Sequence, residues 1–112
     1  MPLQTVRRTK PAGAKGIVEL ERKAAEAAGL LKLLANENRL LILCRLAVAG
    51  EMSVGDLADA VDLSQSALSQ HLAKMREDGL LGTRREAQAV FYHIADPNAA
   101  RLLTLLKSIY CP

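Results

Sequence analysis

Two short helical patterns separated by a very short turn constrain this chain most strongly. Ser53 and Ser64 each stand where a helix N-cap is expected, and each precedes apolar residues at helical spacing. The first pattern ends near residue 60, so only residues 61–63 separate it from the second cap. The second pattern continues to about residue 78 and ends before Gly79. Helices joined by so short a connection predict a helix-turn-helix.

Two further helices are predicted before this motif. An apolar stripe at helical spacing predicts a helix over residues 17–35, and its members are Leu20, Ala24, Ala27, Leu31 and Leu34. A second helix is predicted over residues 37–49, with Asn36 as its N-cap and Gly50 at its end. Because that helix is apolar around most of its circumference, we expect it to be largely buried. The residues concerned are Leu40, Leu41, Leu43, Cys44, Ala47 and Val48.

The apolar pattern changes its period after Gly79. Residues 80–85 and 88–94 each suit an extended strand, with residues 86–87 at the tip of a hairpin between them. Asp96 followed by Pro97 then predicts the start of a last helix. The order α-α-α-α-β-β-α is mainly α with a small β-hairpin. It predicts a winged helix-turn-helix.

Composition limits the organisation of the chain. With 112 residues, half of them hydrophobic, the sequence is long enough for one domain. Residues 1–16 contain two prolines, two glycines and four basic residues, which predicts a flexible basic arm before a domain over residues 17–112. No apolar run approaches the roughly 18 residues of a membrane span, and no secretory signal is visible, so we expect no membrane association and a cytoplasmic location.

The start of the predicted second helix of the motif carries side chains suited to DNA. Its outward residues are Gln65, Ser66, Ser69 and Gln70. Short hydroxyl and amide side chains there can hydrogen-bond base edges and phosphates in a major groove, and a helix N-terminus itself favours a phosphate. An ordinary solvated helix face has the same composition. Arg84 and Arg85 on one shoulder of the hairpin, with Gln88 on the other, are candidate wing contacts, or simply a surface pair of arginines.

The sequence offers little for an enzyme. It shows no Ser-His-Asp arrangement, no histidine cluster for a metal and no Gly-rich phosphate loop, so we predict no catalysis and no cofactor. His71 borders the apolar stripe of its helix, and His93 lies in a strand, so both are interpreted as packing residues.

The two cysteines, Cys44 and Cys111, are too few and too far apart for a disulfide framework or a zinc ribbon. Cys44 by itself suits a small apolar core residue. Cys111 is the penultimate residue, where packing does not require a cysteine. Both are expected to be thiols in a reducing compartment.

Three segments together resemble the ArsR/SmtB family of bacterial winged-helix repressors: residues 63–72, 78–81 and 84–92. The resemblance extends over residues 19–111. It implies a homodimer formed through the first and last helices and bound to an inverted-repeat operator in double-stranded DNA. By position it assigns base and phosphate contacts to Gln65, Ser66, Ser69 and Gln70, and wing contacts to Arg84, Arg85 and Gln88.

The metal sites known in this family are not expected here. The arsenic and cadmium site requires Cys-Val-Cys, where this chain has Ser53, Val54 and Gly55, and soft ions need thiolates. The zinc and nickel site draws Asp and His from the last helix, and residues 96–110 contain one Asp and no His. We therefore predict no metal site of either type, although haem or a metal bound by the two thiols remains open.

The positions of Cys44 and Cys111 resemble instead the thiol-based subgroup that includes BigR, SqrR and HlyU. That resemblance implies a repressor that binds DNA when reduced and is released when a disulfide or polysulfide bridge, formed by reactive sulfur species, links the two cysteines. It also implies control of sulfide detoxification genes. In this mechanism Cys44 is expected to be the less exposed thiol.

Three alternatives stay open at this point. One is a general sensor of peroxide or disulfide stress using the same thiols. Another is a thiol oxidoreductase, against which the lack of Cys-x-x-Cys argues. The third is a winged helix used only for contact with other proteins.

Overall fold

The computed structural model describes residues 11–111. The chain divides into two compact units, one ending at Lys32 and the other beginning at Leu33. The domain boundary predicted near residue 17 therefore does not coincide with this division. Each unit is described by itself.

The first unit consists of helix α2 (Pro11–Arg22) and most of helix α3 (Ala24–Leu34). The sequence predicted one helix over residues 17–35, and this was wrong because the helix is interrupted at Lys23. There the backbone amide donates to the carbonyl of Leu20, three residues back, at 3.0 Å, which is a tighter turn than that of an α-helix. Residues 11–16, predicted to belong to the arm, are helical, while residues 1–10 lie outside the described residues.

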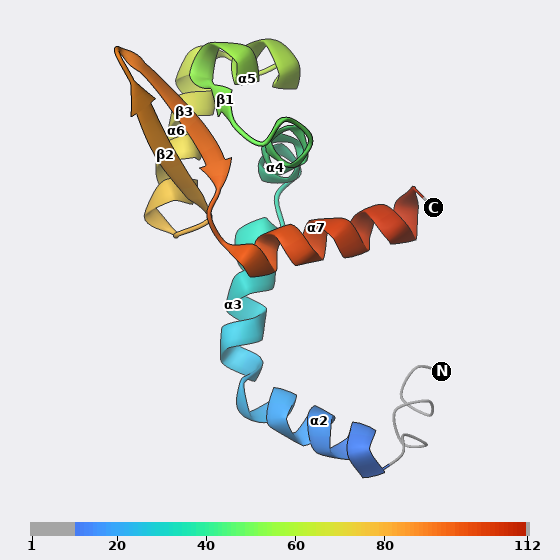
Figure 1. The fold of residues 1–112 in the computed structure, drawn as a ribbon. Coiled ribbons are helices and arrows are strands. Elements are labelled where there is room, and N and C mark those ends of the chain that lie inside the picture. Colours follow the sequence, from blue (N-terminus) through green and yellow to red (C-terminus); the bar gives the residue numbers. More distant parts are fainter. Residues whose placement is uncertain (1–10, 112) are drawn as a thin grey trace. The chain divides into compact units, whose positions relative to one another are not determined.

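The remaining helices begin where their caps predicted (Figure 1). They are α4 (Glu37–Ala49), α5 (Val54–Val61), α6 (Gln65–Glu77) and α7 (Pro97–Tyr110). A side-chain oxygen of the residue before each helix accepts a hydrogen bond from an amide of the first turn, and these residues are Asn36, Ser53, Ser64 and Asp96. Each cap therefore satisfies an amide that the helix itself leaves unpaired.

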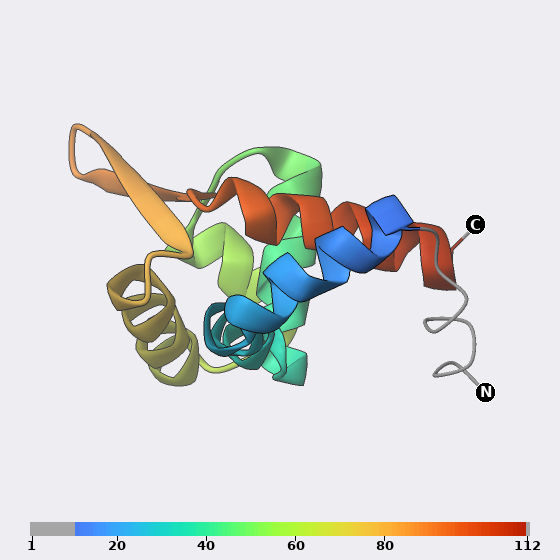
Figure 2. The ribbon, with the colours of Figure 1, turned by 90° about the horizontal axis from the view of Figure 1, so that it is seen from below.

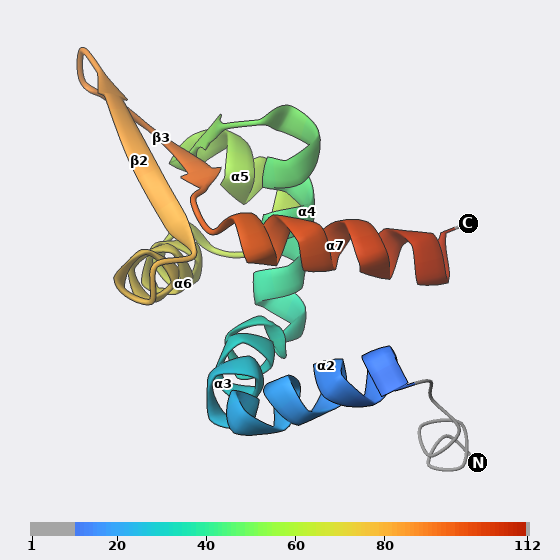
Figure 3. The same ribbon diagram turned by 60° about the horizontal axis from the view of Figure 1, so that its bottom comes forward.

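A three-stranded antiparallel sheet in the order β1-β3-β2 completes the second unit. Its strands are β1 (Met52–Ser53), β2 (Leu81–Glu86) and β3 (Ala89–Ile94), and the β2–β3 hairpin projects beyond α5 and α6 (Figures 1 and 3). Glu86 pairs with Ala89, so the tip consists of residues 87–88 and not 86–87 as predicted. Ala87 has a φ of 55°, the left-handed conformation that a two-residue hairpin turn requires. Strand β1 was not predicted, because two residues cannot show an alternating pattern.

The core of the second unit lies where α4, α5, α6 and α7 meet the inner face of the sheet. Leu68, Leu72 and Met75 of α6 have no exposed surface, as their spacing predicted. They pack with Ile42, Leu43, Leu46, Leu57, Leu80, Leu81, Ala99 and Leu103. These contacts fix the orientation of α6, which lies beside the base of the hairpin (Figure 2).

The prediction that α4 is largely buried was wrong. Only Ile42, Leu43 and Leu46 of this helix are buried, whereas Leu41 is 45% and Val48 89% exposed. Cys44 and Ala47 are exposed as well. The neighbouring elements cover one side of α4, so its apolar circumference could not reveal which side that would be.

Among residues 11–111, no helix has both the length and the apolar composition that a membrane span requires.

Candidate nucleic-acid interface

The N-terminal half of α6 presents the side chains that the sequence assigned to DNA. Gln65, Ser66, Ser69 and Gln70 are all exposed on this helix. The cap beneath them is formed, since Ser64 Oγ accepts from the amide of Ala67 at 3.1 Å. With Leu68 and Leu72 buried behind, the helix is held so that these polar groups point to solvent. The structure therefore brings the four predicted residues together on one surface.

This surface lacks basic side chains of its own. Residues 46–73 contain no Lys or Arg and four carboxylates, at Glu51, Asp56, Asp59 and Asp62. The first cations after them lie at the other end of α6. Lys74 is there held by carboxylates, and the hydrogen bonds that its ammonium donates to Asp78 and to Glu77 raise its pKa. Positive charge near this surface comes from Arg76, which is exposed in the last turn of α6 and forms no ion pair within residues 11–111, and from the hairpin.

A half-buried ion pair fixes the C-terminal end of α6 to α4. The guanidinium of Arg39 lies 3.6 Å from Asp78 Oδ2, and it also donates to the carbonyl oxygen of Leu33 at 3.0 Å. Both charged side chains are only about 15% exposed. Because Asp78 is the C-cap of α6, this pair adds a polar constraint to the apolar core that orients the helix.

The hairpin separates its two arginines onto opposite faces. Arg84 pairs with Phe91 and Arg85 with Val90, and successive side chains of a strand point to opposite sides of a sheet. Arg85 is exposed, and so is Gln88, which lies at the tip of the hairpin and not on its shoulder. Leu81 and Tyr92, which belong to the core side, share the face of Arg85. Arg85 therefore lies on the side of the wing from which α6 packs.

Arg84 is not a free cation. Its guanidinium donates to both oxygens of Glu51, at 3.1 and 2.6 Å, and to Glu86 at 2.9 Å. It also lies 4.8 Å from the centre of the Phe91 ring. The hydrogen bond from Arg84 lowers the pKa of Glu51, and the two carboxylates raise the pKa of Arg84. Glu51 was not predicted as a functional residue, because its partner is distant in the chain and β1 was not predicted.

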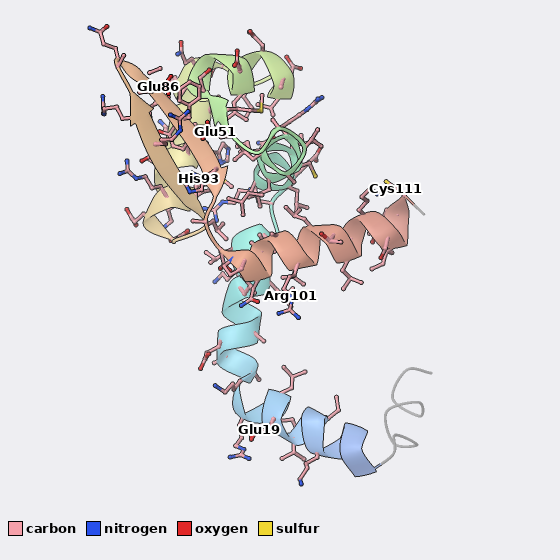
Figure 4. All side chains as sticks on the ribbon, viewed as in Figure 1. Glu19, Glu51, Glu86, His93, Arg101 and Cys111 are labelled. Atoms are coloured by element: carbon pink, nitrogen blue, oxygen red, sulfur yellow. The ribbon has the colours of Figure 1, made fainter. Side chains whose placement is uncertain are left out.

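The two thiols lie at exposed positions. Cys44 is on the uncovered side of α4, between Leu41 and Val48, and Cys111 is the C-cap of α7, at the end of that helix (Figure 4). Helix α4 packs against α7. The expectation that Cys44 is the less exposed of the two finds no support, because both are exposed. No group of three or more potential metal ligands is present among residues 11–111.

Apolar side chains are also exposed in each unit. On α7 they are Leu105, Ile109 and Tyr110, of which Tyr110 is 77% exposed. In the first unit they are Ile17, Val18, Leu20 and Leu31. Large apolar side chains exposed along a helix are typical of a surface that is covered by another protein.

The helix-turn-helix with its exposed polar face and projecting hairpin defines a winged-helix DNA-binding protein. A family model described as "Bacterial regulatory protein, arsR family" matches residues 36–82. The chain is 52% identical over 93 residues to the transcriptional activator HlyU of Vibrio cholerae, and this match covers 83% of this chain and 85% of HlyU. It is 48% identical over 92 residues to the biofilm growth-associated repressor of Agrobacterium fabrum, covering 82% of this chain and 78% of the repressor.

A solved structure shows the same architecture. The transcriptional repressor BigR from Xylella fastidiosa superposes with a TM-score of 0.77 at 40% identity, covering 84% of this chain and 95% of that one. The chain belongs to the ArsR family of winged-helix transcriptional regulators. The predicted fold and family are thereby confirmed, and these relatives are regulators and not enzymes.

Proposed function

We propose that this protein is a dimeric repressor that binds operator DNA in its dithiol form and is released when reactive sulfur species link Cys44 to Cys111. The observation that carries the proposal is the exposure of both thiols on helices that pack together within the DNA-binding unit. Exposed thiols are open to dissolved oxidants. A bridge from the end of α7 to α4 would tie these two helices together.

The chemistry balances with a polysulfide as the oxidant. The thiolate of one cysteine attacks a polysulfide sulfur, which breaks a sulfur–sulfur bond and expels a shorter sulfide anion. The cysteine then carries one or more added sulfurs. The second thiolate attacks this chain, expels hydrosulfide and closes the bridge, so the two thiols lose two electrons to the polysulfide. An unstrained disulfide needs Cα atoms within about 7 Å, and each added sulfur relaxes that requirement.

DNA contacts are proposed for the exposed residues of α6 and the wing. Gln65, Ser66, Ser69 and Gln70 would read base edges and nearby phosphates, and Arg85 and Gln88 would contact the backbone. Replacing Gln65 or Ser69 by Ala should weaken operator binding by about 1–3 kcal/mol for each base that the side chain hydrogen-bonds. Ala100→Ser, an exposed change on α7 away from α6, serves as the control that should leave binding unchanged.

Dimerisation is proposed through α7 together with the helices of the first unit. Each of these elements exposes large apolar side chains, and each protomer of a dimer would supply one α6 to an inverted repeat. Ile109→Glu should shift the protein towards monomer in sedimentation equilibrium, whereas Lys107→Glu, an exposed change on the same helix, should not. A monomer–dimer equilibrium equally unaffected by both changes would contradict this interface.

The thiol mechanism is tested by treating the reduced protein with sodium tetrasulfide and following its release from a duplex of the DNA upstream of its own gene. Cys44→Ser and Cys111→Ser should each bind the duplex like the unmodified protein and stay bound after treatment. Intact mass distinguishes the products, because closing any bridge removes about 2 Da and each sulfur inserted into it adds about 32 Da. Release of the Cys111→Ser protein by tetrasulfide would disprove the pair mechanism.

A further inference from the structure

We propose that Arg84 is a positioning residue, which fastens the wing to the segment before α5 through Glu51, and that it does not contact DNA itself. The inference rests on the proposed operator binding and leaves Arg85 as the arginine of the wing that contacts phosphate. We call Arg84, Glu51, Glu86 and Phe91 the wing clamp.

The register of the sheet places the whole clamp on one face. Arg84 of β2 is opposite Phe91 of β3, and Phe91 is opposite Ser53 of β1. Glu51 precedes Ser53 by two residues and Glu86 follows Arg84 by two, so both share this face (Figure 4). The guanidinium thus crosses β3 above the Phe91 ring and reaches Glu51 on the far side.

The hydrogen bonds commit three of the five N–H groups of Arg84 to carboxylates. Its Nε and Nη2 hold both oxygens of Glu51 in the bidentate geometry that favours a carboxylate, and its Nη1 holds Glu86. With a ring below the guanidinium as well, a phosphate could approach only the two remaining N–H groups, where both carboxylates would repel it. Arg85 is on the opposite face of the hairpin and forms no ion pair within the described residues.

Glu51 makes the clamp a link between the wing and the helix-turn-helix. It directly follows Gly50, the C-cap of α4, and lies two residues before Ser53, the N-cap of α5. Two residues of β1 supply the only backbone pairing between this segment and the hairpin in the part of the chain described. The clamp therefore adds a side-chain constraint that fixes the angle of the wing relative to α5 and α6.

The salt dependence of DNA binding distinguishes a residue that positions the wing from one that contacts a phosphate. Affinity for a fluorescent duplex of the DNA upstream of the chain's own gene is measured by anisotropy over a range of salt concentrations. Arg84→Ala should lower the affinity about three- to tenfold and leave the slope of log affinity against log salt unchanged. Arg85→Ala should make that slope shallower by about 0.9 for each phosphate that the protein no longer neutralises, or about 1.8 for a dimer.

The sign of the Glu51 effect provides a second test. Glu51→Gln removes a negative charge, which by itself strengthens binding to a polyanion, yet loss of the clamp should weaken binding about as much as Arg84→Ala does. Asp59→Asn, which removes an exposed charge from α5 outside the clamp, is the matched control and should not weaken binding. The double variant with Glu51→Gln and Arg84→Ala should bind DNA no more weakly than either single variant. Each single change already breaks the wing clamp, so the second change removes nothing further.

Two results of the DNA-binding measurements would overturn the inference. One is a salt slope for Arg84→Ala that falls as it does for Arg85→Ala, and the other is a Glu51→Gln protein that binds DNA more tightly.

Hydrogen exchange of the β3 amides in the free protein tests the wing clamp independently of the proposed DNA binding. Exchange of these amides should accelerate in both clamp variants, and unchanged exchange would disprove the clamp even if no duplex were bound. Failure of the unmodified protein to bind the duplex would instead refute operator binding.

Discussion

Replacing Gly82 by Ala tests the packing at the base of the wing. Gly82 lies in β2 directly opposite His93 of β3. A Cβ added at Gly82 would lie 2.6 Å from Nε2 and 2.8 Å from Cε1 of the His93 ring. The ring would have to withdraw by at least about 0.8 Å to reach ordinary van der Waals contact. The backbone of Gly82 does not have a positive φ, so the conflict is one of space and not of backbone conformation.

The expected cost follows from two opposing terms. Overpacking costs about 1–3 kcal/mol, and the half-buried His93 can relax partly towards solvent. Against this, Ala in place of Gly restricts the unfolded chain and stabilises the fold by about 0.4–1 kcal/mol. We therefore expect Gly82→Ala to lower the free energy of unfolding by about 1–2 kcal/mol, or Tm by about 3–10 °C.

Urea unfolding at one fixed protein concentration measures this change without a contribution from dimer dissociation varying between samples. The same substitution in a His93→Ala background removes the clash and should stabilise by about 0.4–1 kcal/mol. Gly55→Ala, whose Cβ would meet only Ser53 Oγ at 4.0 Å, is the control for a Gly to Ala change without a clash. If Gly82→Ala were as stable as the unmodified protein in both backgrounds, the steric reasoning would be refuted.

Three further outcomes are expected. Leu72→Ala, at a fully buried position of α6, should lower the free energy of unfolding by about 3–5 kcal/mol in urea, and a change below about 1 kcal/mol would contradict its place in the core. Ser64→Ala should cost about 1 kcal/mol by removing the cap of α6, as urea unfolding can measure. Arg84, and to a smaller extent His93, lowers the pKa of the Glu51 carboxyl below its ordinary value of 4.5. The stability that the Glu51 carboxylate contributes is therefore complete above pH 4.5 and is lost as the pH falls below that value. The free energy of unfolding of Glu51→Gln, measured by urea unfolding against pH, should not show this loss of stability at acid pH.

The helix boundaries of the second unit could be predicted because the signals are local. A cap such as Ser53 or Ser64 hydrogen-bonds an amide three residues later, so the sequence contains both partners side by side. The inward stripe of α6 was predictable for the same reason, since helical spacing alone puts Leu68, Leu72 and Met75 on one side. The break at Lys23 was not, because Leu20 and Leu31 suit one continuous stripe whether or not the helix bends.

The residues of the candidate site could be predicted only in part. Residues of α6 were assigned to the surface from helical spacing, and they are exposed. The two arginines of the wing looked equivalent as neighbours in sequence. They differ because a strand alternates its faces, which leaves Arg85 exposed to solvent and directs Arg84 to Glu51. The hairpin tip lies one residue later than predicted, because Glu86 pairs with Ala89 and therefore belongs to strand β2.

By itself the sequence determined the hairpin, where the helices of the second unit begin and which family the chain resembles, because caps, turn residues and periodicity act over a few residues. Only the tertiary structure decided which side of α4 is covered, that Cys44 is exposed, and that Glu51 lies beside Arg84, 33 positions further along the chain. These depend on how separate elements approach one another, and that is set by the summed packing of the core and not by any local pattern.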